Sequence, residues 1–321
     1  MKHGRLVISL DFELLWGVFD KIDYNKKVDY FENTRRVVPK LIKLFEDYDI
    51  HATWATVGML FNENWEQWIE NIPRELPAYN SSKLSAYQFG LNNKDLIKNE
   101  LCFAHDIIDI IHKSKGQEMA THTYSHYYCL EDGQTVHSFH SDLKKAIQIA
   151  ENKGIQLKSL VFPRNQFNPE YLEICKELGI TGVRINPDNW YWNNTQKDTL
   201  LQKIFRTGDA YLGLMDKAYD ISTMNRDLPV QQRASRLLRP KESEFKNDLK
   251  LKRIFDEMQF AAKNKNIYHL WWHPHNFGND PEGNLNDLKL ILECYKKCQK
   301  NYGLVSNSMS EISHMVISGS N

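Results

Sequence analysis

Short apolar runs alternate with amphipathic stretches along most of the chain, and this alternation constrains the fold more than any other feature. The run RLVISLDF (5–12) is typical of a buried strand, and NTRRVVPKLIKLFEDYD (33–49) is typical of a helix that starts near Pro39. This strand–helix order recurs about six or seven times without a linker, which predicts a parallel sheet, open or closed into a barrel. The other predicted strands are 51–60, 117–126, 159–163, 181–186 and 267–274, and the other predicted helices are 103–116, 141–154, 169–179, 248–266 and 284–303.

We expect residues 1–321 to form one α/β domain with insertions at about 62–98 and 188–240, where the alternation is lost. A structureless loop as long as the second insertion is unusual in a compact domain. It is therefore expected to contain short elements that cover or border a site. In the predicted helix 141–154, Ser141 is expected to be the N-cap.

Charge and composition limit the classes of partner. The chain has 41 Lys+Arg and 41 Asp+Glu, a net charge of +0, which argues against a nucleic-acid binder that works through a basic field. Its first apolar run carries Asp11 and Glu13, unlike a secretory signal, and no stretch approaches the ~20 apolar residues of a membrane span. The five cysteines include no C-x-x-C pair, which fits reduced thiols. These features predict a cytoplasmic protein and leave open only peripheral membrane contact.

Three clusters of metal-ligating or titratable residues follow predicted strands. They are Asp11 with Glu13, His122 with His126, and His273 with His275. Because the carboxyl ends of parallel strands meet at one edge of a sheet or barrel, we expect the clusters to converge. Two carboxylates at the end of an apolar strand are costly to bury unless a positive charge binds there. Two histidines at i, i+4 share one face of a helical turn, a spacing used to chelate metal ions.

Each cluster also has an ordinary structural explanation. An acidic pair can lie in a solvated turn, H-x-x-x-H occurs by chance, and a histidine after an apolar strand is often hydrogen-bonded in the core. Together, however, the clusters offer two histidines and one carboxylate, the ligand set of an open catalytic metal site. A second carboxylate and a further histidine are left to act as base and acid.

On these motifs the chain resembles the NodB-type polysaccharide deacetylases, carbohydrate esterase family 4. THTYSH (121–126) is similar to the family's second motif, and SLDFE (9–13) is similar to its first, with Phe12 in place of the usual second aspartate. HATWATVG, VFPRNQFN, NPDNWYW and HLWWHPH are similar to further family segments. The resemblance covers most of the chain and implies a distorted parallel (β/α)7 barrel.

The resemblance also implies roles for individual residues. Asp11 would be the catalytic base, and Arg164 would pair with it; His273 would be the general acid, with His275 as its competitor. The metal would be Zn²⁺, or another divalent ion such as Co²⁺, Ni²⁺, Mn²⁺ or Fe²⁺. Its implied ligands are Glu13, His122 and His126, and the implied substrate-binding residues are Phe167, Trp190, Asp188 and His275.

The implied activity is hydrolysis of an N-acetyl group on an amino sugar. A cytoplasmic enzyme would act on a surface-polysaccharide or glycan precursor, either a nucleotide sugar or a lipid-linked saccharide. The locally basic segment 233–253 would face phosphates or anionic lipid, or would simply be a solvated helix face. Three alternatives stay open: hydrolysis of another linear or cyclic amide C–N bond, a non-catalytic carbohydrate-binding protein on a degenerate deacetylase fold, and a mononuclear Fe(II) oxygenase.

Overall fold

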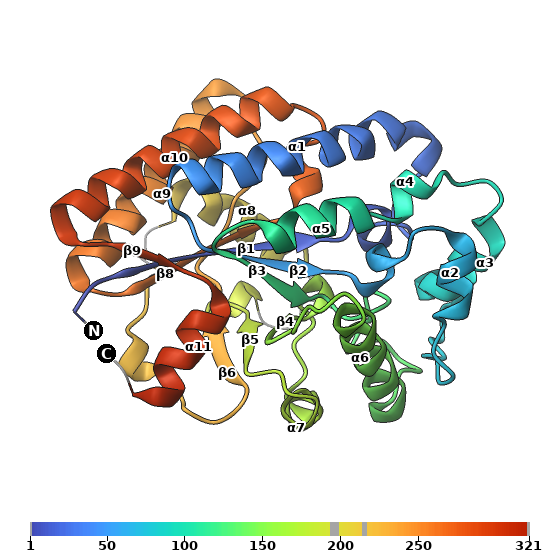
Figure 1. Ribbon diagram of the computed structural model, residues 1–321. Coiled ribbons are helices and arrows are strands. Elements are labelled where there is room, and N and C mark those ends of the chain that lie inside the picture. Colours follow the sequence, from blue (N-terminus) through green and yellow to red (C-terminus); the bar gives the residue numbers. More distant parts are fainter. Residues whose placement is uncertain (1, 193–198, 214–216, 320–321) are drawn as a thin grey trace.

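A curled parallel sheet forms the centre of the protein in the computed structural model, which describes residues 2–192, 199–213 and 217–319 (Figure 1). Its strands run in the order β6-β5-β4-β3-β2-β1-β8-β7, and β9 pairs with the start of β1. The paired strands of this sheet are all parallel in the described residues, as the alternation of strands and helices predicts. The strands are β1 Arg5–Phe12, β2 Ala52–Thr56, β3 Gln117–Thr121, β4 Ser159–Val161, β5 Gly182–Ile185, β6 Val230–Arg233, β7 Arg236–Leu237, β8 Ile267–Trp272 and β9 Val305–Asn307.

The two edges of this sheet are joined by one interrupted strand. β6 pairs with β5 and β7 pairs with β8, and only Ala234 and Ser235 separate β6 from β7. The Ala234 N–H donates to the Ile185 carbonyl at 2.9 Å, and the Ser235 N–H donates to the His269 carbonyl at 2.8 Å. The sheet therefore closes through β6 and β7, and the predicted distorted (β/α)7 barrel is confirmed.

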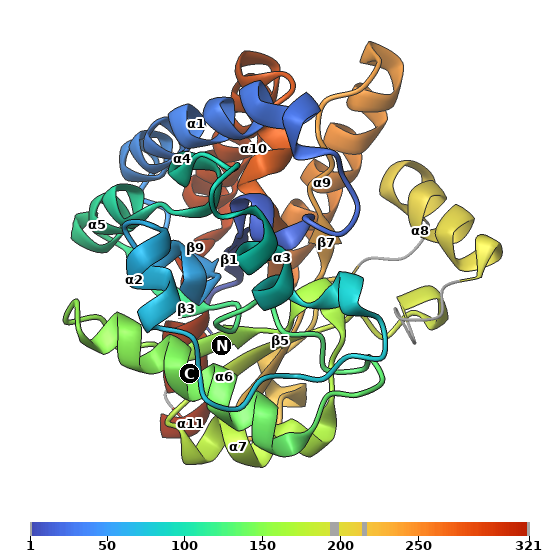
Figure 2. The same cartoon turned by 90° about the vertical axis from the view of Figure 1, so that its right-hand side faces the viewer.

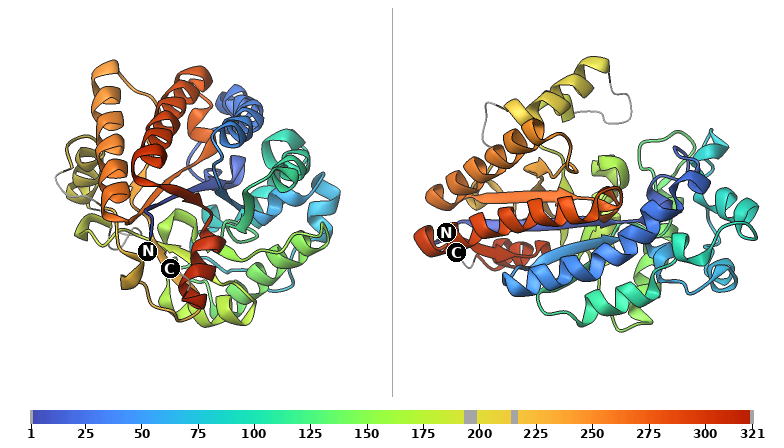
Figure 3. Two further views of the ribbon diagram at one scale, coloured as in Figure 1. Left: turned by 60° about the vertical axis from the view of Figure 1, so that its left-hand side comes forward. Right: turned by 90° about the horizontal axis from the view of Figure 1, so that it is seen from above.

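Helices surround the barrel (Figures 1 and 3). Helices α1, α9 and α10 lie on one side of the sheet, and α6 and α7 lie on the other. Among the described residues, no helix is long and apolar enough to cross a membrane. The helices are α1 Val28–Asp47, α2 Trp65–Glu70, α3 Ala86–Asn93, α4 Asn99–Cys102, α5 His105–Lys113, α6 Val136–Glu151, α7 Leu172–Glu177, α8 Leu200–Leu212, α9 Glu244–Asn264, α10 Pro281–Tyr302 and α11 Met309–Ser318.

The barrel interior changes from apolar to polar along β1. Val7 packs with α11 in an apolar cluster that fills the amino-terminal end of the barrel, whereas Ser9 and Asp11 contact polar side chains across the interior. The alternate residues of β1 face the surrounding helices, because successive strand side chains point to opposite faces. They belong to the main hydrophobic core and are Leu6, Ile8, Leu10 and Phe12.

Two predicted helix starts are wrong. Helix α1 begins at Val28 and contains Pro39, which lies on its exposed side, where water can hydrate the carbonyl that the proline leaves unbonded. Helix α6 begins at Val136 and is capped by Thr135, so Ser141 lies inside it. The first insertion contains α2 and α3, and the second contains α8, β6 and β7. The short β9 and helix α11 lie outside the elements predicted from the sequence.

Candidate active site

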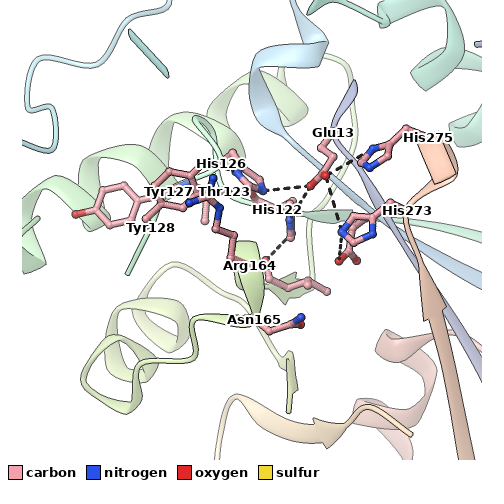
Figure 4. Close-up of polar contacts among 12 residues, drawn as sticks. Glu13, His122, Thr123, His126, Tyr127, Tyr128, Arg164, Asn165, His273 and His275 are labelled. Carbon is pink, nitrogen blue, oxygen red and sulfur yellow. Dashed lines mark hydrogen bonds and ion pairs between the residues drawn. The ribbon is translucent and has the colours of Figure 1, made fainter. Parts of the chain in front are cut away.

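The three sequence clusters converge at the carboxyl end of the barrel. Glu13 follows β1, the loop from His122 to His126 follows β3, and His273 and His275 follow β8. Figure 4 shows Glu13 at the centre, with the first two histidines on one side of it and the other two on the opposite side. The topology therefore assembles residues that lie more than a hundred positions apart into one site.

Glu13, His122 and His126 are buried and form a compact group of donor atoms. The Nε2 atoms of His122 and His126 lie 3.4 Å and 3.1 Å from Glu13 Oε2. One ligand atom from each residue lies within 4.8 Å of the others, and among the described residues this is the one such group of His, Cys, Asp or Glu. These are the three residues that the sequence resemblance implied as metal ligands, and they are called the metal-ligand group below.

The donor atoms of this group fit a divalent cation. His122 Nδ1 bonds the Val161 carbonyl at 2.9 Å, which leaves a lone pair on Nε2 directed at Glu13. Neither His122 Nε2 nor Glu13 Oε2 has a hydrogen bond in the described structure, although both atoms are buried. Burial lowers the pKa of His126 to about 4, so this ring is neutral, as a metal ligand must be. Two imidazoles and a carboxylate are a ligand set that Zn²⁺ favours.

The two ligand histidines are not on a helical turn, so that part of the sequence interpretation is wrong. Residues 122–126 form a loop in which Thr123 and His126 adopt left-handed φ angles of 62° and 58°. Such angles are costly for residues other than glycine, above all for a β-branched threonine. The Thr123 hydroxyl accepts a hydrogen bond from the Tyr127 N–H at 2.7 Å. The loop, rather than helical periodicity, therefore brings the two rings to Glu13.

Asp142 of α6 fixes this loop by accepting hydrogen bonds from it. Its carboxylate accepts the Tyr124 N–H at 2.7 Å and the Ser125 hydroxyl and N–H, and it also accepts the Tyr87 hydroxyl at 3.0 Å. Burial raises the pKa of Asp142 to about 6. Sequence reasoning missed this residue, because its role depends on the packing of α6 beneath the loop.

Replacing Asp142 by alanine is expected to lower the free energy of unfolding by about 2–4 kcal/mol, because buried N–H groups lose their acceptor. We also expect metal affinity to fall roughly 10- to 100-fold, the usual cost of losing a group that orients ligands. Chemical denaturation and metal titration measure the two effects. Asp142→Asn, which keeps one acceptor oxygen, should cost less in both assays. Unchanged metal affinity in Asp142→Ala would contradict this role.

The absence of a side chain at Gly17 leaves the space that the Glu13 carboxylate fills. A Cβ atom on Gly17 would lie 2.0 Å from the carboxylate carbon of Glu13, so no other residue fits here unless Glu13 moves. Burial raises the pKa of Glu13, but interactions with the neighbouring imidazoles of His273, His126 and His122 outweigh burial and hold this pKa well below its ordinary value. Glu13 is therefore ionised as well as buried.

Asp11 is paired with Arg184, not with Arg164. The Nη1 and Nη2 atoms of Arg184 lie 2.7 Å from Asp11 Oδ1 and Oδ2, a bidentate pair that spans the barrel interior from β5 to β1. Burial raises the pKa of Asp11, but the Arg184 charge and His122 outweigh it and leave this pKa below its ordinary value. Asp11 is therefore an oriented, ionised carboxylate beside the metal-ligand group.

Arg164 lies elsewhere at the rim of the site, and the predicted pairing with Asp11 is wrong. Its guanidinium binds both oxygens of Asp20 and lies 4.1 Å from the centre of the Tyr128 ring. Arg184 gave a signal in the sequence, because an arginine inside the apolar strand 181–186 needs an anion once it is buried. That signal did not identify the partner.

His273 and His275 both face the carboxylates but differ in exposure. His273 Nε2 lies 3.7 Å from Asp11 Oδ2 and 3.8 Å from Glu13 Oε1, and its side chain is 27% exposed. His275 Nδ1 lies 3.6 Å from Glu13 Oε1, with 7% of its side chain exposed. Burial lowers the pKa of His275 to about 4. The more accessible ring, His273, is the one beside Asp11.

The three other residues predicted to bind substrate have contacts of their own. Phe167 packs edge-on against Phe162, and Asp188 forms an ion pair with Arg233. Trp190 is half-exposed and packs against Phe205 of α8. Within the described part of the chain, no hydrogen bond, ion pair or ring contact joins any of these three to Glu13, His122 or His126, so their role in binding substrate stays a prediction.

The curled parallel barrel, with carboxylates and histidines gathered at its carboxyl end, indicates a carbohydrate deacetylase. The family model for polysaccharide deacetylase matches residues 16–183, slightly more than half of the chain, and the chain belongs to this family. The matched segment contains His122 and His126, whereas Asp11, Glu13, Arg184 and His273 lie outside it. No curated protein matches the sequence.

Solved structures share the fold at low sequence identity. A Mycobacterium smegmatis protein assigned to the polysaccharide deacetylases has a TM-score of 0.62 at 13% identity, covering 99% of this chain and 92% of its own. A Pseudomonas aeruginosa PAO1 protein with the same assignment has a TM-score of 0.55 at 10% identity, covering 97% and 89%. Puue allantoinase has a TM-score of 0.54 at 13% identity, covering 98% and 90%. These likenesses support the barrel fold.

Proposed function

We propose that this protein is a metal-dependent N-deacetylase that acts on an amino sugar in a cytoplasmic glycan precursor. The observation that carries the proposal is the position of Asp11 and His273 beside the Glu13–His122–His126 group. A ligand group alone would suit a structural metal or an oxygenase. A separately oriented base and an accessible imidazole at the same opening are what hydrolysis of an amide requires.

Glu13, His122 and His126 would hold the cation, with Zn²⁺ the ion that best suits the donors. When bound, such an ion acts as a Lewis acid on the acetyl carbonyl and acidifies water. Asp11 accepts the proton of the attacking water, and Arg184 keeps its carboxylate turned toward the site. Each Asp11 oxygen keeps a lone pair after bonding Arg184, and Asp11 lies outside the clustered donor atoms of Glu13, His122 and His126, so Asp11 acts as a base rather than as a further metal ligand.

His273 donates a proton to the departing sugar amine, because an amide nitrogen is a poor leaving group until it is protonated. Its exposure lets it reach the substrate, whereas His275 lies beneath it with the two rings stacked 5.0 Å apart. His275 therefore supports the orientation of His273 and Glu13.

The variants Asp11→Asn and His273→Ala are expected to retain metal while turnover falls by about 10²- to 10⁴-fold, the usual contribution of one general acid or base. Metal analysis and an acetate-release assay measure the two quantities on the same samples. His275→Ala serves as the comparison and should lose less turnover than His273→Ala. Metal loss in both Asp11→Asn and His273→Ala would show that these residues are ligands and would refute their assigned roles.

The activity itself is tested with a panel of amide substrates. We expect acetate release from N-acetylated amino sugars, with less or no hydrolysis of a cyclic ureide or of an N-formyl sugar. Ring opening of the ureide with no acetate release would replace the deacetylase proposal by cyclic amide hydrolysis. Sugar binding with no turnover, unchanged in Asp11→Asn, would establish a carbohydrate-binding protein instead.

A further inference from the structure

A cavity of about 330 Å³ lies beside the barrel opening, between α8 and the segment that contains β7. Helix α8 contributes Lys203 and Arg206 to its wall, and the opposite wall contains Arg236 and Arg239. Lys217 is a fifth cation, and Asp209 is the one carboxylate in the lining. Trp192 and Trp271 add aromatic surface. The cavity is therefore a basic pocket with aromatic walls.

This basic pocket shares a wall with the candidate active site. Trp271 lines the pocket, and its ring lies 4.3 Å from the Arg184 guanidinium carbon and 5.7 Å from the His273 ring. Asn165 also lines the pocket, and its side-chain oxygen accepts a bond from Arg184 at 3.4 Å. The Trp271 ring thus lies between a group bound in the pocket and the His273 ring.

Internal ion pairs neutralise only part of the positive charge. Arg236 is held by the buried carboxylate of Glu257 at 2.6 Å and 2.7 Å, and Lys217 pairs with Asp209. No carboxylate lies within ion-pair distance of Lys203 or Arg239 in the part of the chain that the structure describes. The Glu242 carboxylate is near enough to Arg239 for an electrostatic interaction, but it already accepts a hydrogen bond from Lys246 at 2.8 Å. Lys203 and Arg239 therefore line a half-enclosed space without a carboxylate partner among the described residues, an arrangement that favours an anionic ligand.

We infer that this basic pocket binds a phosphoryl group attached to the amino sugar, so that the substrate is a glycosyl phosphate or diphosphate. The inference rests on the proposed deacetylase function. The guanidinium group of arginine, which offers several N–H donors in one plane, and the ammonium group of lysine are the groups that recognise phosphate oxygens. With the phosphoryl group in the pocket, the sugar lies across Trp271 toward His273, where its acetamido group can reach the metal-ligand group.

The surface next to the pocket favours a lipid as the other substituent of the phosphate. Helix α8 stands away from the barrel in Figure 2, and of its residues only Ala210 is buried. An apolar face of α8, with Ile204, Phe205 and Leu212, lines a neighbouring cavity, and Asp209 lines both this cavity and the basic pocket. An aliphatic chain leaving the phosphate would remain in contact with apolar side chains. The exposed ones are Trp190, Leu200, Leu201, Ile204, Phe205 and Leu212.

The pocket is tested first by binding of inorganic pyrophosphate to the metal-loaded protein, measured by calorimetry. The double variant Lys203→Ala/Arg239→Ala should weaken binding at least about 10-fold, because each cation removed takes away a charge-assisted contact. The control Lys144→Ala/Lys252→Ala removes two exposed positive charges elsewhere and should bind like the parent. Absence of binding in the parent, or equal binding in the parent and the Lys203/Arg239 variant, would overturn the inference.

Kinetics then connect the pocket to the substrate. The Lys203/Arg239 variant should raise KM about 10-fold for a diphosphate-linked N-acetylhexosamine and leave KM for the free N-acetylhexosamine unchanged. Equal effects on both sugars would refute a phosphoryl subsite. Pyrophosphate binding that depends on Lys203 and Arg239, without deacetylation of any sugar, would instead refute the proposed function and leave the anion site standing.

A last pair of substrates identifies the source of the phosphate. A short-chain polyprenyl diphosphate sugar should be deacetylated with a lower KM than the corresponding nucleoside diphosphate sugar. Phe205→Ser should raise KM only for the polyprenyl substrate, because Phe205 lies on the apolar face of α8 and outside the lining of the basic pocket. A lower KM for the nucleoside substrate, unaffected by Phe205→Ser, would overturn the lipid assignment.

Discussion

His126→Ala is expected to abolish tight binding of a divalent cation and, with it, all measurable deacetylation. The parent should hold about one ion per chain, because Glu13, His122 and His126 offer three ligand atoms within 4.8 Å of one another. Removal of one leaves only two protein ligands for an ion that normally keeps three in a catalytic site. The expected loss of affinity exceeds the roughly 10- to 100-fold cost of losing a group that merely orients a ligand.

Metal analysis of the two purified proteins, after reloading with Zn²⁺ and desalting, gives the result directly. His137→Ala is the matched control, because His137 is exposed on α6 and should leave both metal content and turnover unchanged. Equal metal content in the parent and His126→Ala would refute the assigned ligand set. A parent that takes up no ion under these conditions would remove the basis for metal-dependent hydrolysis.

Arg184→Met should lower the free energy of unfolding by about 3–5 kcal/mol, because it leaves the Asp11 carboxylate buried without its counter-charge. The same change should abolish turnover, since Asp11 loses the group that orients it and keeps its pKa below the ordinary value. Denaturant unfolding and the acetate-release assay measure the two effects. Adding Asp11→Asn to Arg184→Met should restore part of the stability and none of the activity.

Two other arginines provide controls for this prediction. Arg35→Met breaks an ion pair in which Arg35 Nη2 bonds both oxygens of Asp106, which is 53% exposed, and a hydrogen bond to the Phe103 carbonyl at 2.6 Å. It should cost about 1–2 kcal/mol of stability, less than Arg184→Met. Arg164→Met leaves the Asp11–Arg184 pair intact and should cost less turnover than Arg184→Met. The reverse order of activity loss would return the orienting role to Arg164.

Local sequence patterns predicted the strands well because burial and periodicity are properties of short segments. RLVISLDF, QEMATHTYSH and IYHLWWHP each contain a strand of the barrel, and the three site clusters lie at or just after the carboxyl ends of these strands. Since parallel strands carry their carboxyl ends to one edge, their order alone was enough to bring Glu13 to His122 and His126. The convergence of the clusters was therefore predictable without knowing any contact, whereas the choice of Glu13, His122 and His126 as metal ligands came from the family resemblance.

Partners across the barrel could not be predicted in the same way. Arg164 and Arg184 both follow or lie in predicted strands, and nothing local distinguishes them as partners of Asp11. The choice depends on direction: Arg184 points into the interior, whereas Arg164 has a left-handed φ of 54° at the rim, where it binds Asp20. The loop at Thr123 likewise depends on hydrogen bonds that its backbone N–H groups donate to the Asp142 carboxylate and to the Thr123 hydroxyl.

The sequence by itself determined the parallel barrel and the convergence of the three site clusters, because both follow from the order and burial of segments along the chain, and the family resemblance added the prediction that Glu13, His122 and His126 bind a metal. Tertiary structure alone decided that Arg184 pairs with Asp11, that His273 is the accessible histidine, and that α8 and β7 enclose a basic pocket beside the site. Each of these depends on which side chains point into a shared space once distant segments have packed. That direction is set by neighbours far away in the sequence.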